Sequence, residues 1–362
     1  MHIGLLIYGD METISGGYLY NRHLVSYLRH QGEQVTVISF PYRSYGRHLT
    51  DNFNQACFKQ LTEVKLDVLI QDAMVHPSLV LLNRRLSRHS QVPLISLVHL
   101  LTTYEQHARW KAWFYRFIER QYLQTVSGLI VNSQTTLRQV TELLPKPVPY
   151  CLAVPAGDNF QGIKDVQVEM DFIRQRTGQT GPLKILVVGN VIRRKGLHML
   201  INALRLLPIE DYQVTVAGCL TMEPAYIQQL KNTLQGTALE KSIIFKGLVQ
   251  GQALIDLYQA HQLMVLPSAY ESYGIVYVEA QQFGVPVIGT TAGAAQEIIK
   301  QGENGYLIPP EDHHALASLL QTLHQDRTLL FQLSQHALVA YAQHPKWQAS
   351  CEIIRQFLYE QV

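Results

Sequence analysis

The chain has 362 residues, of which 47% are hydrophobic and 16% are charged, and its formal net charge at pH 7 is +2. This length exceeds that of a usual single domain and the composition excludes a disordered chain, so we expect two globular domains of similar size. Lys and Arg outnumber Asp and Glu by four in residues 1–160, whereas acids are in excess by two in the remainder. The asymmetry is too weak for a nucleic-acid-binding protein, although it could help one domain meet an anionic surface.

The first half of the chain alternates short apolar runs with longer amphipathic stretches. The apolar runs predict buried strands at 2–8, 34–40, 67–72, 93–99 and 128–133. Residues 18–31 predict a helix that ends at Gly32. Repeated strand–helix–strand units predict a parallel sheet with helices on both faces.

The same pattern restarts in the second half. The apolar runs predict strands at 183–190, 212–218, 241–247, 262–268, 285–290 and 305–310. The stretch before them has no strand signature, and residues 161–180 are the predicted linker, with a short helix inside 168–178. The prediction is therefore an α/β protein of two doubly wound, Rossmann-like sheets, with ligands at the carboxyl ends of the strands.

Cysteine and histidine patterns argue against a metal site. The four cysteines form no CxxC pair and the fifteen histidines form no HExxH motif, so we expect neither a metal nor a disulfide framework. The chain opens directly on an apolar strand without a basic leader, and no apolar run approaches the ~18 residues that span a bilayer. We expect a cytoplasmic protein, with peripheral contact at the inner face of a membrane left open.

One glycine-rich turn, or corner, follows the first strand of each half. Gly16 and Gly17 precede a helix, where bare backbone N–H groups can approach a phosphate, although a plain turn explains them equally well. The second corner, in "VVGNVIRRKG", gathers the cations of residues 193–195, which could neutralise a diphosphate or could simply be solvated. Neither corner is GxGxxG, which disfavours a dehydrogenase.

Two glutamates flank the start of the helix predicted at 275–283. Glu271 lies on the loop after strand 262–268, and the backbone N–H groups of residues 272–274 open the helix, where a diphosphate is favoured. Glu279 comes about a turn and a half later, where its carboxylate can accept hydrogen bonds from a vicinal diol. Glutamates near a helix start are also good helix formers, so the pair alone proves little.

Taken together, the Ser-Gly-Gly turn, the "VVGNVIRRKG" corner and the E-x7-E element with its "GVPVIGT" continuation resemble the retaining GT-B glycosyltransferases of family 4. The motif order matches over nearly the whole chain. The resemblance implies two Rossmann-like domains that face a central cleft. Residues 1–160 plus about 345–362, whose helix crosses back, would bind the acceptor, and residues 181–344 would bind the donor.

The resemblance also implies residue roles. Glu271 would hold the sugar hydroxyls of the donor, Lys195 with Arg193 or Arg194 would stabilise the departing diphosphate, and His99 would reach the transferred sugar or acceptor. The implied catalytic residues are His99, Arg194, Lys195 and Glu271. The implied donor-binding residues are Gly16, Gly17, Asn190, Arg193, Leu248, Val249, Ser272, Tyr273, Gly274, Ile275 and Glu279. Among these, Glu279 would hold the ribose, while Leu248 and Val249 would pack on the base.

Four positions depart from the family pattern. Asn190 stands where most members have Arg, Leu100 follows the histidine where Asp is common, and Ser272-Tyr273 replace Gly-Phe. The ionic residues remain, so the departures bear mainly on which nucleotide fits.

The function implied is transfer of a hexosyl group from a UDP- or GDP-sugar to a hydroxyl on a glycan, lipid or small molecule, with retained configuration, no metal and no cofactor beyond the co-substrate. Two alternatives stay open. A nucleotide-sugar epimerase on the same fold would need no acceptor, and an inactive relative would bind the nucleotide sugar without releasing its nucleotide.

The stretch 107–122 predicts a helix with two distinct faces. Trp110, Trp113, Phe114 and Phe117 share one face, and Arg109, Arg116 and Arg120 share another. The helix either packs on the sheet with its arginines in water or lies at the surface of an anionic membrane near a lipid acceptor. No nucleic-acid partner is expected.

Overall fold

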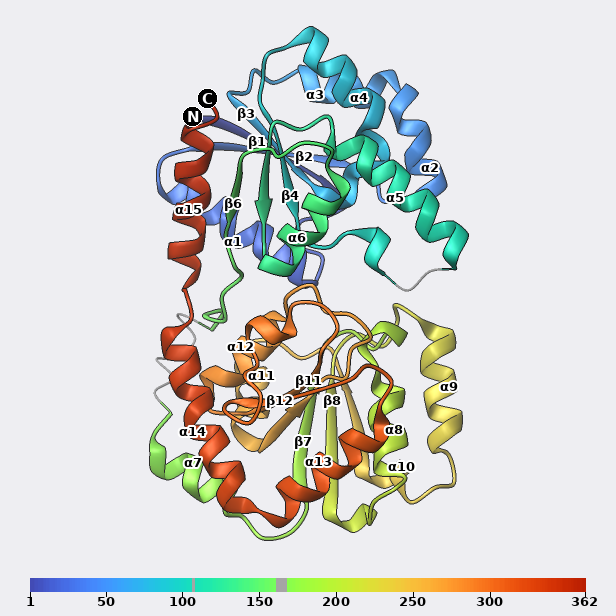
Figure 1. Ribbon diagram of the computed structural model, residues 1–362, viewed down its shortest axis with the longest axis vertical. Helices are drawn as coiled ribbons and strands as arrows, with labels where there is room; N and C mark the ends of the chain where they lie inside the picture. The colour runs from blue at the N-terminus through green and yellow to red at the C-terminus, as the bar shows by residue number, and fades with distance from the viewer. Residues whose placement is uncertain (106–107, 161–167) are drawn as a thin grey trace. The chain divides into compact units, whose positions relative to one another are not determined.

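The computed structural model describes residues 1–105, 108–160 and 168–362, and these divide into two units (Figure 1). Unit 1 comprises Met1–Pro155 and Pro345–Val362, and unit 2 comprises Ala156–His344. Residues 161–167 of the predicted linker lie outside the described residues, and the rest of that range belongs to unit 2. His107, the first residue of the predicted two-faced helix, is also outside them.

Unit 1 is built on a parallel sheet with the strand order β2-β1-β3-β4-β5-β6. Its strands are β1 (His2–Tyr8), β2 (Gln34–Phe40), β3 (Val68–Asp72), β4 (Leu94–Val98), β5 (Gly128–Val131) and β6 (Tyr150–Leu152). The edge strand β6 was not predicted, because its three residues carry no apolar run. The central strands β3 and β4 are buried along their whole length, as expected of a sheet covered on both faces.

The helices of unit 1 connect these strands. They are α1 (Gly16–His30), α2 (Tyr45–Thr50), α3 (Gln55–Thr62), α4 (His76–His89), α5 (Arg109–Leu123), α6 (Gln134–Leu143) and α15 (Trp347–Tyr359), with 3-10 turns η1 (Asp51–Phe53), η2 (Ala73–Val75) and η3 (Thr102–Tyr104). The C-terminal helix α15 packs beside α1 and β6, where it returns to the first unit as expected (Figure 1). Ser350 Oγ donates to the Val154 carbonyl at 2.6 Å, and Glu33 accepts from Arg355 at 2.9 Å.

Unit 2 repeats the architecture with the strand order β12-β11-β10-β7-β8-β9, again all parallel. Its strands are β7 (Leu183–Val188), β8 (Tyr212–Ala217), β9 (Ile243–Gly247), β10 (Leu263–Val265), β11 (Val287–Thr290) and β12 (Gly305–Ile308). Its helices are α7 (Met170–Thr177), α8 (Leu197–Leu204), α9 (Pro224–Leu234), α10 (Leu239–Ser242), α11 (Gln252–Ala260), α12 (Ile275–Gln282), α13 (His313–Gln325) and α14 (Arg327–Gln343), with turns η4 (Arg193–Lys195), η5 (Ile209–Asp211) and η6 (Ala295–Glu297). The prediction of two doubly wound sheets is confirmed.

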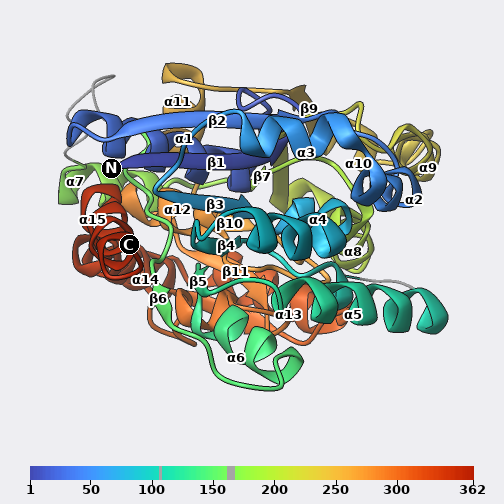
Figure 2. The same ribbon diagram turned by 90° about the horizontal axis from the view of Figure 1, so that it is seen from above.

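Both sheets reverse their strand order beside the first strand of the unit. In unit 1 the chain leaves β1 for β2 on one side and returns to β3 on the other (Figure 2). In unit 2 the corresponding neighbours of β7 are β8 and β10. Loops that follow adjacent strands on opposite sides of such a reversal diverge, which leaves room for a ligand at the carboxyl edge. The β1–β3 and β7–β10 edges are therefore where functional residues should gather. In the described part of the chain, no helix has the length and apolar character needed to cross a membrane.

Candidate active site

The loops after β7 and β10 are joined by their backbones. Gly196 follows η4 with a left-handed φ of 71°, and a Cβ at this position would stand 2.0 Å from the Pro267 carbonyl oxygen. Next to this close approach, the N–H of Ala269 donates to the Arg194 carbonyl at 2.8 Å. Glycine is thus required at position 196, because only a residue without a side chain permits both the conformation and the contact.

This junction brings Lys195 and Glu271 into an ion pair. Lys195 Nζ lies 2.6 Å from Glu271 Oε2, which also accepts from Ser268 Oγ at 3.2 Å. Arg194 lies 4.0 Å from Glu271 Oε1 and donates to the Tyr270 carbonyl at 2.9 Å. Two cations and one carboxylate therefore meet at the β7–β10 edge, which matches the placement expected of a site that binds an anion.

Burial and charge act in opposite directions on this pair. Burial raises the pKa of Glu271, but Lys195 and Arg194 outweigh it, so the pKa lies below its usual value. Burial lowers the pKa of Lys195, and the Glu271 carboxylate opposes this. The carboxylate is therefore ionised near neutral pH, and it favours the protonated form of the lysine.

The backbone of Glu271 is held by the segment after β11. The N–H of Glu271 donates to the Ala292 carbonyl at 3.2 Å, and the N–H of Ala294 donates to the Glu271 carbonyl at 2.8 Å. Gly293 between them has a φ of 88°, and a Cβ there would stand 2.0 Å from the Glu271 oxygen. Gly293 was not among the predicted site residues, although its place after a buried strand is a signal for such a contact.

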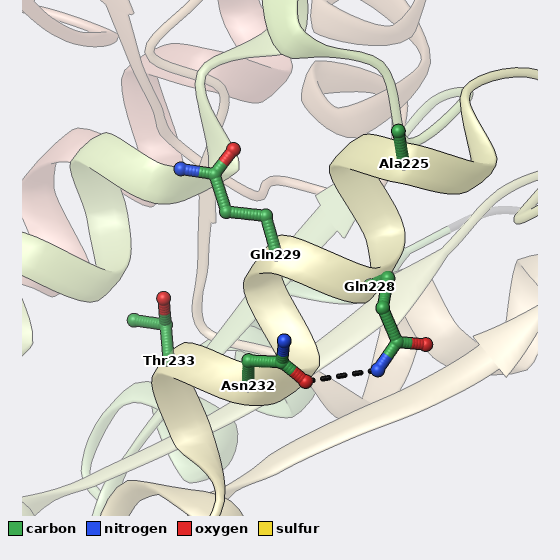
Figure 3. A pocket seen from close by; sticks show the side chains of 5 residues that line it. All are labelled: Ala225, Gln228, Gln229, Asn232 and Thr233. Atoms are coloured by element: carbon green, nitrogen blue, oxygen red, sulfur yellow. Dashed lines mark hydrogen bonds between the residues drawn. The ribbon is translucent and has the colours of Figure 1, made fainter.

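Arg193 is directed to a different place. Its guanidinium donates to Gln229 Oε1 at 2.7 Å and lies 5.3 Å from the Tyr226 ring centre, both on α9. Figure 3 shows Gln229 in a surface depression of α9, whose lining also includes Gln228 and Asn232, joined by a 2.8 Å hydrogen bond. Of the predicted basic residues, Arg194 and Lys195 reach Glu271, whereas Arg193 binds this polar helix surface.

The start of α12 is shaped by a glycine. Gly274 is the N-cap residue with a φ of 102°, and a Cβ there would stand 2.4 Å from the Tyr277 ring. Ser272 is half-buried, and the buried Tyr273 makes a 2.7 Å hydrogen bond between its hydroxyl and His344 Nε2. Ile275 opens the helix. The loop thus lies between the Glu271 carboxylate and the positive end of α12.

Glu279 is buried on the second turn of α12 with both carboxylate oxygens engaged. Tyr258 Oη donates to Oε2 at 2.8 Å, and Asn159 Nδ2 donates to Oε1. Burial raises the pKa of Glu279, against the lowering effect of these hydrogen bonds. Tyr258 stacks on Phe283 at 5.2 Å between ring centres, so its hydroxyl is fixed in place. Neither Asn159 nor Tyr258 was predicted, since only the fold brings them to α12.

The remaining residues predicted to bind the donor lie on loops at the same carboxyl edge of the sheet. Asn190 is half-buried in the turn after β7, where its carbonyl accepts from the Ile192 N–H at 2.9 Å. Leu248 and Val249 follow β9, and Leu248 is 49% exposed, which makes it an apolar surface open to a planar ring.

In unit 1, Gly17 and His99 meet at the edge where β1, β3 and β4 end. A Cβ on Gly17 would stand 3.2 Å from the His99 ring, so the glycine lets α1 approach the ring closely. Gly16 is the first residue of α1, after Ser15, whose side chain caps the helix. His99 is buried, which lowers its pKa, while the charge of Asp72 acts in the opposite direction.

Asn21 and Asp72 fix the tautomer of His99. The Asp72 carboxylate can only accept, so Asn21 must donate to it through Nδ2, a contact of 2.8 Å. Asn21 Oδ1 then faces His99 Nε2 at 2.9 Å, and the ring nitrogen must be the donor. A neutral His99 therefore carries its proton on Nε2, and its Nδ1 is the basic nitrogen.

Asn132 completes this group. Its amide donates to the His99 carbonyl at 2.9 Å, and its buried Oδ1 has no hydrogen-bond partner among the described residues. Asn21, Asp72 and Asn132 were not among the predicted site residues. Two signals were available, because Asn21 is a polar residue on the apolar face of α1 and Asp72 ends a buried strand.

Part of the chain is similar to a known protein family. Residues 169–344 match the family described as Glycosyl transferases group 1. An uncharacterized glycosyltransferase of Methanocaldococcus jannaschii is 32% identical over 203 residues, which cover 54% of this chain and 51% of that protein. A D-inositol 3-phosphate glycosyltransferase of Corynebacterium urealyticum is 27% identical over 61% of this chain and 54% of its own length. The chain thus spans about half the length of these curated relatives.

Solved structures share the fold over nearly the whole chain. Sucrose-phosphate synthase from Thermosynechococcus elongatus is similar with a TM-score of 0.82 at 20% identity, covering 99% of this chain and 98% of that one. Anabaena HepE in complex with UDP-glucose is similar with a TM-score of 0.77 at 20% identity, covering 99% and 100%. The fold is therefore that of GT-B proteins, and within it residues 169–344 resemble the glycosyl transferases group 1 family.

Proposed function

We propose that the protein is a retaining glycosyltransferase that moves a hexosyl group from a UDP- or GDP-sugar to a hydroxyl of a glycan, a lipid or a small molecule. The observation that carries the proposal is the Lys195–Glu271 ion pair at the β7–β10 edge, inside a domain that resembles the group 1 family. Relatives named as glycosyltransferases and a neighbour crystallised with UDP-glucose support a nucleotide-sugar donor.

The diphosphate would bind to Lys195 and Arg194. In the structure these cations lie beside Glu271, so an arriving diphosphate offers Lys195 a second anion of higher charge. When the Lys195 ammonium group turns from Glu271 to the phosphate, a lone pair of the Glu271 carboxylate becomes free to accept a hydrogen bond from a sugar hydroxyl. The leaving diphosphate is then stabilised by charges that are already in place, which is the largest contribution expected of such a site.

The nucleoside would occupy the surface from Glu279 to the loop after β9. Each carboxylate oxygen accepts one hydrogen bond in the structure and keeps a second lone pair, so Glu279 can still accept from a ribose diol. Leu248 and Val249 offer the base an apolar surface. Asn190, Ser272 and the amides around Gly274 would add neutral contacts to the phosphates.

His99 would contact the transferred sugar or the acceptor through Nδ1. This nitrogen accepts a hydrogen bond in the neutral tautomer that Asn21 and Asp72 enforce. The acceptor hydroxyl would attack on the face from which the diphosphate leaves and would pass its proton to a donor phosphate oxygen. No metal ion is required in this route, and unchanged turnover in the presence of EDTA is the expected result.

The first experiment is thermal unfolding with UDP, GDP and their sugars. A ligand at about a hundred times its dissociation constant stabilises the folded state by about 2.7 kcal/mol, which is readily measured. The stabilising donor is then incubated with candidate acceptors, and proton NMR reads the anomeric configuration of the product. An inverted product would overturn the retaining assignment, and an isomerised donor formed without an acceptor would identify an epimerase instead.

Variants separate the roles. Lys195→Ala should lower kcat by about 10²–10³-fold, while Lys241→Ala, an exposed lysine on α10, should leave it unchanged. His99→Ala should lower kcat/KM by at least about tenfold without changing nucleotide affinity, because its contacts belong to unit 1. Equal rates for Lys195→Ala and wild type would remove the leaving-group assignment.

A further inference from the structure

Helix α5 presents an aromatic stripe to solvent. The exposed fractions are 68% for Trp110, 70% for Trp113 and 49% for Phe117. These residues recur at helical spacing on one face, and Trp113 and Phe117 stack with ring centres 6.1 Å apart. Large apolar side chains grouped on an exposed face indicate an interaction surface.

The opposite face of α5 explains why the stripe points outward. Tyr122 and Leu123 are buried there, and so is Glu119. The Glu119 carboxylate accepts from the backbone N–H groups of Thr102 and Thr103, the second at 3.1 Å, and from the Thr103 hydroxyl. Rotation of α5 to cover the tryptophans would break these bonds and expose the buried side chains, so the fold itself keeps the stripe in solvent.

The charges around the stripe are positive. Lys111, Arg116 and Arg120 are exposed on α5, and Lys111 lies 5.5 Å from the Trp110 ring centre. Helix α4 lies beside α5 (Figure 2). Its Arg84 and Arg88 side chains are exposed. Neither helix contains an acid other than the buried Glu119. An acid on the adjoining helix α6, Glu142, is engaged by Tyr104 at 2.8 Å.

We propose that α4 and α5 form a docking surface for an anionic phospholipid bilayer. Tryptophan favours the headgroup level, where its ring is apolar and its N–H is hydrated, and exposed Lys and Arg are attracted to anionic headgroups. The combination of an aromatic stripe and basic residues on a helix that does not span the membrane is the pattern of interfacial binding. Charge complementarity selects this occupant, because the face offers no exposed acid on either helix to pair with a basic partner.

Tryptophan fluorescence tests the proposal directly. The chain has three tryptophans, and Trp347 is buried, so the exposed emission comes from Trp110 and Trp113. Vesicles of phosphatidylcholine with phosphatidylglycerol should shift the emission to the blue and protect it from iodide. The Trp347→Phe variant should keep the shift, and the Trp110→Phe/Trp113→Phe variant should lose it. No shift with wild-type protein, or an equal shift with pure phosphatidylcholine, would overturn the proposal.

Vesicle flotation with surface variants separates the aromatic and basic contributions. Each basic charge removed near the surface should weaken partitioning by about fivefold, so Arg116→Glu/Arg120→Glu should reduce it by well over tenfold at low salt. Trp113→Ser/Phe117→Ser should also reduce it. The matched controls are Lys241→Glu and Val339→Ser, which alter exposed residues of unit 2 and should bind as wild type. Equal binding by all four variants contradicts the assignment of the surface.

Light scattering without vesicles distinguishes a second copy of the chain as the occupant. A dimer that dissociates in the Trp113→Ser/Phe117→Ser variant would overturn the bilayer assignment, and an unchanged mass supports it. The vesicle experiments contain neither donor nor acceptor. Their failure would therefore leave the proposed glycosyl transfer standing, and an inactive protein that still binds vesicles would leave the docking surface standing.

Discussion

Exchanging Lys195 for Met and Glu271 for Gln, singly and together, measures what the ion pair contributes to the fold. At 2.6 Å the two charges attract by about 6 kcal/mol for an effective dielectric constant of about 20, and desolvation offsets much of this. Lys195→Met leaves a buried carboxylate with Arg194 at 4.0 Å and Ser268 as its remaining side-chain partners, so a loss of about 3 kcal/mol is expected. The double variant should recover part of it, with a coupling free energy of about 2 kcal/mol.

The pH dependence of the same cycle gives a second readout. The pKa of Glu271 is depressed in the folded state, so its stabilisation is present above the unfolded pKa and is lost as the pH falls towards the folded pKa. Without Lys195, burial raises this pKa and the carboxyl is neutralised at a higher pH. The difference in stability between Lys195→Met and wild type should therefore be largest at pH 7 and shrink on acidification.

The measurement is the unfolding free energy of the four proteins, by urea at pH 7 and at pH 4.5. A coupling below about 0.5 kcal/mol, together with a difference between Lys195→Met and wild type that does not change with pH, would refute the reasoning. It would mean that the two side chains are solvated separately in solution.

Three further outcomes are expected. Gly196→Ala should destabilise the protein by at least about 2 kcal/mol, seen as a lower melting temperature, because a side chain there meets both a left-handed φ and a carbonyl oxygen. Burial lowers the pKa of His76 to about 4, so its contribution of about 3 kcal/mol should be present above pH 6.5 and lost as the pH falls towards 4; a flat unfolding free energy across this window contradicts it. Tyr258→Phe removes a hydrogen bond to Glu279 and should weaken nucleoside diphosphate binding by about fivefold in calorimetry. An unchanged affinity would contradict the assignment of Glu279 to the ribose.

The predicted elements of the fold came from patterns that are local in the sequence. Among the described residues, the apolar runs predicted eleven strands within a few residues, and the short edge strand β6 is the one they missed. The loop residues around Lys195 and Glu271 were predicted as site candidates because they follow such strands. The strand pattern alone could not predict their meeting, because it does not say that β10 rather than β8 or β9 lies on the free side of β7.

Hydrogen-bond partners of the site residues that come from distant parts of the chain could not be predicted from the sequence, for the same reason. His99 was a candidate by its place after a strand, but Asn21 and Asp72, which set its tautomer, come from α1 and β3. Spacing along one helix cannot reveal such contacts, because they depend on which strands become neighbours and how closely the helix approaches.

What the sequence by itself determined is the identity of the elements and the two faces of α5. Helical periodicity separates Trp110, Trp113 and Phe117 from the face that carries Glu119, yet it does not say which face is inward. Composition alone would bury the tryptophans and expose the glutamate. In the tertiary structure the glutamate is buried and the tryptophans are exposed. The Glu119 carboxylate accepts hydrogen bonds in the turn after His99, and Tyr122 and Leu123 supply the buried apolar side chains on the same side of the helix.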